Sequence, residues 1–322
     1  MKKLVNGVLV AVMCLYLLPL EAFAARQLVP VGEVIGLELS NGSVSVAAFD
    51  EELGKLAQAA GLQVGDEIVA IDGVTVDDAQ DIHLALERSN GQVQLRIVRD
   101  RQEQELCLTP AITSQGPRLG VYLKQGITGI GTVTWYDPAT GSFGTLGHGF
   151  NDSDGDLVQR TAGRAYEASV LSVKRGKIGE PGQLRGGVDG AAVLGSLQKN
   201  TLRGVFGSAE KGWEGQAVEV AQSNQVKTGP ATIRSTVSGD AVQEYSVEIL
   251  KIYPKAKTEG RNLLIRVTDP ALLAATGGIV QGMSGSPIIQ DGKLVGAVTH
   301  VLVSDPTTGY GIFIKNMLDV AA

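Results

Sequence analysis

Short apolar runs separated by glycines and Asp-Pro turns fill the chain from about residue 119 to its end. Short strands with turn signals between them are typical of β-barrels and β-sandwiches, whereas strands alternating with long helices would indicate a parallel sheet. The pattern therefore predicts an all-β barrel or sandwich, and residues 119–322 are long enough for a double barrel. Examples of the runs lie at residues 129–135, 168–173, 245–252, 263–267, 293–298 and 311–314.

Residues 28–110 follow a different pattern, in which predicted strands alternate with two predicted helices. A short helix is expected over residues 53–60, and a second helix with one apolar face over residues 78–89. Between them, residues 65–73 predict a turn, a strand and an Asp-Gly turn. This order indicates a small α+β domain. A polar, proline-containing stretch at residues 111–118 is then expected to be a linker.

Composition narrows the possible functions. The chain is 43% hydrophobic and 19% charged, which is typical of a protein that buries a core. Its net charge of −6 argues against a nucleic-acid partner. The two cysteines, Cys14 and Cys107, leave no intramolecular disulfide or cysteine-based zinc site once the N-terminal segment is removed. With only three histidines, we expect no structural metal site. No cofactor is expected either.

The first 24 residues have the pattern of a signal peptide. Lys2 and Lys3 precede an apolar run over residues 4–20, and an Ala-x-Ala motif follows at residues 22–24. Such a segment predicts export across the cytoplasmic membrane with cleavage after Ala24. The alternative is an uncleaved N-terminal membrane anchor, because a run of 17 residues, apolar apart from Asn6, Gly7 and Pro19, is at the lower limit for a membrane-spanning helix.

A serine between glycines marks the most chemically informative stretch, QGMSGSPI at residues 281–288. Glycines allow a tight loop that exposes the hydroxyl of Ser284. The same loop can direct the N–H groups of Gly282 and Ser284 at one point, which would form an oxyanion hole. We therefore predict Ser284 as a nucleophile, whereas Ser286 is expected to be structural.

A serine hydroxyl attacks only when a base removes its proton. His148 lies between glycines in FGTLGHGF at the end of a predicted strand, and it is the preferred base. We prefer it because a base should come from the opposite side of the cleft to Ser284. His300 follows a strand soon after Ser284 and is the second candidate.

A carboxylate should orient the imidazole of the base. Asp269 ends a predicted strand and precedes Pro270, from where it could project into a cleft. Other aspartates lie between His148 and Ser284, and the sequence leaves them open: Asp152, Asp154, Asp156 and Asp189. The first three alternate along the chain as in calcium-binding loops, but no glutamate closes a twelve-residue motif, so we expect no metal there.

Residues 60–76, AGLQVGDEIVAIDGVTV, resemble a PDZ domain, and the resemblance covers about eighty residues. PDZ domains bind an extended peptide by strand addition, and main-chain N–H groups of an apolar-glycine loop hold its terminal carboxylate. The resemblance implies a peptide C-terminus as ligand, with Ile35, Gly36 and Leu37 at the carboxylate end of the groove. His83 is expected to be a surface residue of the neighbouring helix.

Residues 119–322 resemble the stage IV sporulation protein B peptidase family, through FGTLGHGF, RVTDPALLAATGGIVQGMSGSPIIQDGKLVGAVTHV and DPTTGYGIF. The resemblance implies a chymotrypsin-like double β-barrel after the PDZ domain. It also implies Ser284 as nucleophile, His148 as base and Asp269 as acid. The implied activity is cleavage of a membrane-bound regulator, between the mother-cell and forespore membranes, that leads to sigma-factor activation. Self-cleavage is a further trait of this family.

Two other functions remain open from the sequence. The chain could be a non-catalytic PDZ scaffold whose barrel has lost activity, because a Ser-Gly-Ser turn is a common loop. It could also be an esterase that uses the same residues. The esterase is disfavoured because residue 286 is serine where the G-x-S-x-G motif has its last glycine, and because no strand–turn–long-helix context surrounds Ser284.

Overall fold

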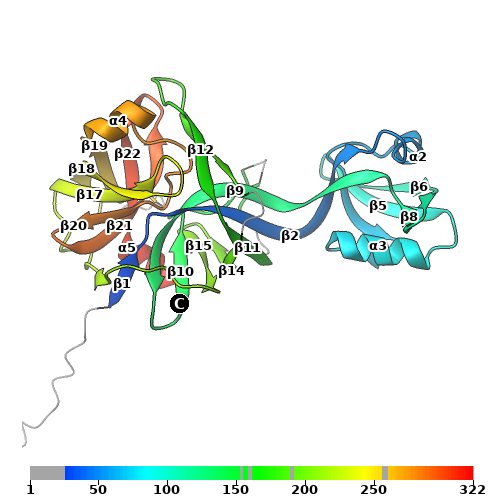
Figure 1. Ribbon diagram of the computed structural model, residues 1–322, viewed down its shortest axis with the longest axis horizontal. Coiled ribbons are helices and arrows are strands. Elements are labelled where there is room, and N and C mark those ends of the chain that lie inside the picture. Colours follow the sequence, from blue (N-terminus) through cyan, green and yellow to red (C-terminus); the bar gives the residue numbers. More distant parts are fainter. Residues whose placement is uncertain (1–25, 153–154, 159–161, 189–191, 256–259, 322) are drawn as a thin grey trace, which may run out of the picture.

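The computed structural model describes residues 26–152, 155–158, 162–188, 192–255 and 260–321 (Figure 1). The predicted signal peptide therefore lies outside the described residues. The chain is mostly β and contains two six-stranded barrels and a small α+β domain, which confirms the predicted fold class. None of the helices in the described ranges has the length and apolar character needed to cross a membrane.

The first barrel closes through the strand order β2-β9-β10-β15-β14-β11, with β11 pairing back onto β2. Its interior is apolar, and Val133, Phe143 and Leu197 are buried there. Two short strands, β1 (Gln27–Pro30) and β16 (Val218–Glu219), extend the sheet beside β9. The six barrel strands are β2 (Val34–Phe49), β9 (Val121–Asp137), β10 (Ser142–Thr145), β11 (Ala162–Glu167), β14 (Val193–Thr201) and β15 (Gly204–Ala209).

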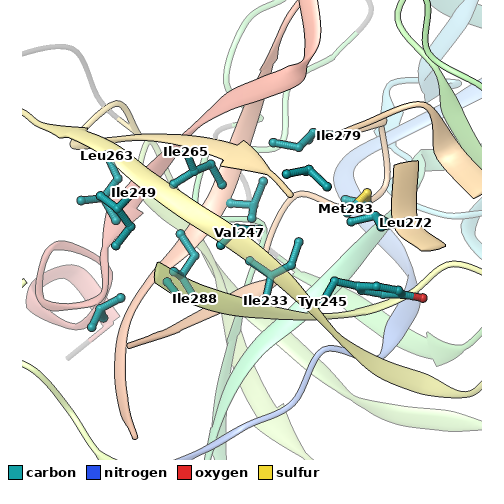
Figure 2. Packing of buried hydrophobic residues seen from close by; sticks show 14 of the residues in the cluster. Ile233, Tyr245, Val247, Ile249, Leu263, Ile265, Leu272, Ile279, Met283 and Ile288 are labelled. Carbon is teal, nitrogen blue, oxygen red and sulfur yellow. The ribbon is translucent and has the colours of Figure 1, made fainter. Parts of the chain in front are cut away.

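The second barrel closes through the order β17-β18-β19-β22-β21-β20. Figure 2 shows its core, in which Ile233, Val247, Ile265 and Ile288 pack together. Met283, from the loop that carries Ser284, is fully buried in the same cluster. The strands are β17 (Gly229–Thr236), β18 (Val242–Ile252), β19 (Leu263–Val267), β20 (Pro287–Gln290), β21 (Lys293–Leu302) and β22 (Asp305–Phe313), and the helices are α4 (Pro270–Thr276) and α5 (Ile314–Ala321).

The small domain is inserted between β2 and β9. Both strands run side by side from the first barrel into this domain, where they join its sheet (Figure 1). The helix α3 covers the sheet with Ile82 and Leu86, which are buried against strand residues such as Ile68. The other elements are α2 (Lys55–Ala59), β3 (Glu67–Ile71), β4 (Val74–Thr75), α3 (Ala79–Arg88), β5 (Val93–Arg99) and β6 (Gln102–Leu108).

The boundaries of the small domain differ from the sequence-based expectation. Residues 28–39, expected at its start, form β1 and the first half of β2 in the first barrel. Residues 111–118, expected as a linker, form a hairpin of β7 (Ala111–Thr113) and β8 (Gly116–Arg118) that packs on α3. The physical reason is that the long strand β2 pairs in the first barrel and also in the small domain, and a periodicity of two along a strand does not reveal its partner strands.

Candidate active site

Two loops remote in sequence meet at a pocket of about 460 Å³. His148 follows β10 in the first barrel and Ser284 precedes β20 in the second, and both line this pocket. His300, on β21, lines it as well. The structure thus brings the predicted nucleophile and both candidate bases to one place.

The loop carrying Ser284 is tightly bent and is held from the first barrel. Gly285 has a φ of +99°, and a Cβ there would lie 2.0 Å from the carbonyl oxygen of Thr132. Thr132 on β9 donates its N–H to the Ser284 carbonyl (3.0 Å) and its hydroxyl to the Gly282 carbonyl (2.8 Å). Only glycine permits this approach, which explains why glycines surround the serine.

The backbone amides of this loop fall into two groups. Those of Met283, Gly285 and Ser286 donate to other carbonyls of the chain. Those of Gly282 and Ser284 have no hydrogen-bond partner among the described residues. The two unpartnered donors are the pair predicted to form the oxyanion hole, and each donor of such a hole typically contributes about 3–4 kcal/mol to acyl transfer.

A hairpin contacts the residues that lead into this loop. It consists of β12 (Ser169–Lys174) and β13 (Gln183–Gly187). Leu184 donates its N–H to the Gln281 carbonyl (2.8 Å), and Gln281 donates to the Gly182 carbonyl (2.9 Å). The hairpin therefore fixes the residue immediately before Gly282. Sequence analysis missed this contact, because nothing in the pattern connects residues a hundred positions apart.

Between the end of β10 and His148 the chain turns through two residues in the left-handed region, Leu146 (φ 68°) and Gly147 (φ 70°). Leu146 is buried and non-glycine, so its backbone stores strain of the kind that clusters at functional sites. A Cβ on Gly147 would lie 2.9 Å from the Thr299 side chain on β21. The turn is thus packed directly against the second barrel.

The protonation of His148 follows from its surroundings. Its Nδ1 lies 2.8 Å from the Gly149 carbonyl oxygen, which can only accept, so Nδ1 carries the proton and Nε2 keeps a free lone pair. Burial lowers the pKa of His148 below 6.5, although this hydrogen bond partly opposes the effect. A neutral imidazole with a free Nε2 is the form that a general base requires.

His300 lies beside His148, with ring centroids 5.3 Å apart. Burial, the neighbouring His148 and Arg261 lower the pKa of His300 to about 4, so it is neutral at pH 7. Its Nδ1 is buried and has no partner among the described residues. His300 lacks the carbonyl contact that fixes the ring of His148, and we therefore keep His148 as the base.

The hydroxyl of Ser284 donates to the Thr299 carbonyl oxygen at 2.8 Å rather than to His148. Rotation about the Cα–Cβ bond of Ser284 is needed to redirect this proton to the imidazole. Ser286 is fully buried and its hydroxyl bonds to that of Ser235 at 3.1 Å, so it sits in the second barrel as a structural residue.

The structure does not bring Asp269 to His148. Asp269 is the N-cap of α4, where its carboxylate accepts from the N–H groups of Ala271 (2.9 Å) and Leu272 (3.0 Å) and from that of Ser246 (3.3 Å). It is not among the residues that line the pocket, and no other described Asp or Glu is. The reason is that the strand before Asp269 leads directly into a helix, whose free N–H groups bind the carboxylate.

The predicted peptide-binding residues Ile35, Gly36 and Leu37 require a correction. They lie in the middle of β2 and are paired with β9 on one side and β11 on the other, so no edge is free for an added strand. Ile35 and Leu37 are buried in the first barrel. The prediction was wrong because an apolar-glycine stretch that leads into a strand does not show which sheet the strand joins.

The groove of the small domain lies elsewhere. A pocket of about 420 Å³ opens between α3 and the start of β9, and residues 118–123 line it. Over this stretch β9 pairs only with β2, so its other edge is unpaired in the described structure. The sequence signal is Leu119-Gly120-Val121, a second apolar-glycine stretch, which directly follows the segment expected to be a linker.

The double barrel, the PDZ-like insertion and the serine and histidine loops together define a serine peptidase that carries a PDZ domain. A family model described as SpoIVB peptidase S55 matches residues 115–318, and a PDZ domain model matches residues 53–99. The chain belongs to the SpoIVB peptidase S55 family and is a serine peptidase.

Two solved structures of one protease are also similar. One is the active form of the Rv3671c protease from M. tuberculosis, which is 16% identical in sequence. The match covers 74% of the present chain and 81% of the Rv3671c chain, with a TM-score of 0.34. The other is the inactive form of the Rv3671c protease, which is 14% identical. That match covers 60% of the present chain and 82% of the Rv3671c chain, also with a TM-score of 0.34.

Proposed function

We propose that this chain is an exported serine endopeptidase in which Ser284 is the nucleophile and His148 the general base. The observation that carries the proposal is the pairing of two unpartnered amides, on Gly282 and Ser284, with a serine hydroxyl and a neutral imidazole in one pocket. Acyl transfer needs these three components together.

The reaction proceeds in two halves. The Ser284 oxygen attacks the peptide carbonyl while His148 Nε2 takes the hydroxyl proton, and the two amides hold the resulting oxyanion. His148 then gives this proton to the leaving amine as the C–N bond breaks, which leaves an acyl-enzyme. Water attacks the ester with His148 again as base, and the carboxylic acid and free serine are released.

The proposed substrate is a membrane-associated regulatory protein whose cleavage activates a sigma factor during sporulation. Membership of the SpoIVB peptidase family supports this substrate and, with it, a location between the forespore and mother-cell membranes. The signal-peptide pattern of residues 1–24 supports export across the cytoplasmic membrane. Self-cleavage belongs to the same proposal. It is tested by whether purified chain carrying Ser284→Ala remains intact while the wild type shortens.

The PDZ groove is proposed to bind a peptide C-terminus as a strand added to the free edge of β9, which would regulate the peptidase. The Leu119-Gly120-Val121 stretch and Arg118 line that groove, and the positive charge of Arg118 would favour a carboxylate there. Peptides with a free carboxylate should bind more tightly than their carboxamides in a fluorescence polarisation assay. Equal binding of the two forms would contradict the proposal.

The catalytic assignment is tested with a fluorophosphonate probe and with casein. Ser284→Ala should abolish both labelling and hydrolysis, and His148→Ala should slow both strongly. Ser286→Ala is the matched control, because its hydroxyl is buried against Ser235, and it should label normally. A wild-type chain that the probe does not label, or a Ser284→Ala chain that still cleaves casein, would favour the non-catalytic scaffold or another nucleophile.

A further inference from the structure

The described residues that line the active-site pocket include no Asp or Glu, and what orients His148 is read from its hydrogen bond. The contact that the structure shows is the one from His148 Nδ1 to the Gly149 carbonyl oxygen, at 2.8 Å. A carbonyl in a loop fixes an imidazole only if its own peptide group is fixed.

Asn200, near the end of β14, holds that peptide group. Its Oδ1 accepts the N–H of Phe150 at 2.9 Å, and this N–H belongs to the same peptide unit as the Gly149 carbonyl. Because a trans peptide is planar, with N–H and C=O pointing in opposite directions, the unit joins Asn200 on one side to His148 on the other. The series of hydrogen bonds runs from Nδ1–H of the imidazole through one peptide to the side-chain amide.

The amide nitrogen of Asn200 fixes the rest of the loop. Nδ2 donates to the Phe150 carbonyl at 2.7 Å and to the Val158 carbonyl at 3.0 Å. These partners determine which atom of the amide is oxygen, because a carbonyl can only accept and an N–H can only donate. All three contacts go to main-chain groups within ten residues of His148.

Packing leaves this peptide little freedom to move. A Cβ on Gly149 would lie 2.3 Å from the Leu157 side chain and 3.1 Å from the Thr201 carbonyl oxygen. The ring of Phe150 lies against Gly129 on β9, where a Cβ would come within 2.7 Å of it. The backbone between His148 and Phe150 is therefore confined on both sides.

We infer that Asn200 is a positioning residue for His148, acting through the peptide between Gly149 and Phe150. Asn200 is not among the residues that line the active-site pocket, so its role is to position His148 and not to react. It fixes the carbonyl that keeps the imidazole in the Nδ1–H form with Nε2 free. This inference rests on the proposed function, in which His148 is the general base.

Two substitutions of Asn200 separate positioning from stability. Asn200→Ala removes all three hydrogen bonds. Asn200→Asp keeps an acceptor for Phe150 but loses both donations, and it places a negative charge one peptide away from the imidazole. That charge favours the protonated imidazole, so the pKa of His148 should rise.

The chain offers a close control in Gln290 of β20, which makes the same pattern of bonds in the second barrel. Its amide accepts from Lys227 N–H (2.9 Å) and donates to the carbonyls of Lys227 (2.9 Å) and Pro230 (3.2 Å). Gln290→Ala and Gln290→Glu therefore remove equivalent contacts, but they do so away from His148.

The experiment measures the second-order rate of fluorophosphonate labelling against pH, with casein hydrolysis and thermal melting on the same full-length proteins. Asn200→Ala should label about a hundredfold more slowly, since a catalytic group misplaced by about 1 Å loses that much. For casein, kcat should fall while KM stays near the wild-type value. In Asn200→Asp, the fall in labelling rate at acid pH should have its midpoint at a higher pH than in the wild type. Both Gln290 variants should keep the wild-type rate and the wild-type midpoint.

The inference is overturned if folded Asn200→Ala and Asn200→Asp chains label at the wild-type rate with the wild-type acid limb. It is equally overturned if the Gln290 variants slow labelling as much as the Asn200 variants, because the effect would then be loss of stability alone. Failure of the proposed function looks different: His148→Ala would then label as fast as the wild type.

Discussion

At the scale of single residues, the burial of His148 decides the pH at which the site works. Burial lowers the pKa of this imidazole below its ordinary 6.5. A base acts only when it is deprotonated, so activity is present above the lowered pKa and is lost as the pH falls through it. We expect the acid limb of fluorophosphonate labelling to have its midpoint below pH 6.5. A midpoint above that value would mean that a carboxylate lies against the imidazole in the working enzyme.

Asp269 provides a second prediction at this scale, because a helix cap and a triad acid differ in their tolerance of asparagine. Asparagine caps a helix about as well as aspartate, whereas loss of the cap to alanine costs about 1 kcal/mol. Since Asp269 caps α4, Asp269→Asn should keep most of the casein activity and Asp269→Ala should lower the melting temperature. If Asp269 oriented the base, the Asp269→Asn enzyme would instead have a kcat about 10⁴-fold lower than the wild type. That result would restore Asp269 as the acid.

At the scale of elements, the β12–β13 hairpin supports the loop that carries Ser284. Gly182, just before β13, accepts from Gln281, and a Cβ there would lie 2.4 Å from the Gly176 nitrogen and 2.5 Å from the Val280 side chain. Gly182→Ala should therefore displace residues 280–281 and slow both labelling and hydrolysis.

Gly179, at the turn of this hairpin, provides the comparison for Gly182. It has a φ of +82°, and nothing lies within 4 Å of the position of its Cβ. Gly179→Ala should cost about 1 kcal/mol of stability through its backbone conformation and leave the labelling rate unchanged. If Gly182→Ala and Gly179→Ala label alike, the hairpin does not support the oxyanion loop.

At the scale of the whole molecule, the PDZ domain is an insertion with its own ion pair, in which the carboxylate is buried and the arginine side chain is partly exposed. Asp66 is 1% exposed, and Arg99 binds both of its carboxylate oxygens at 2.6 Å. Arg99→Met leaves this carboxylate unpaired, which costs about 3–5 kcal/mol for a buried charge. Of the two tryptophans, Trp135 lies on β9 of the first barrel and Trp213 packs against the core of that barrel. During heating of Arg99→Met, circular dichroism should thus detect an unfolding transition of the PDZ domain at a lower temperature than the transition that tryptophan fluorescence reports.

The comparison for Arg99→Met is Lys55→Met, because Lys55 forms an exposed pair with Glu52 at 3.2 Å in the same domain. Exposed pairs contribute about 0–1 kcal/mol, so the two probes should still agree in that variant. Coincident transitions in Arg99→Met would show that the insertion and the barrels unfold as one unit.

The sequence predicted local features well and long-range pairing poorly. The expected helix over residues 78–89 is α3 (Ala79–Arg88), and the loops of His148 and Ser284 meet as expected. The groove at Leu119–Leu123 was missed, since alternation along a strand does not reveal its partner strands. Asn200 was missed for the same reason: its partners lie 42 and 50 residues earlier, and only barrel closure brings them together.

The paired strands β2 and β9 are the covalent entry to and exit from the PDZ insertion. A single proteolytic nick inside the insertion would yield two polypeptides on a denaturing gel. Each fragment would nevertheless keep one strand of the shared ladder, and both would contribute to the first barrel. Gel filtration would report one particle of unchanged size, so processing at such a site would remodel the PDZ groove without releasing the peptidase.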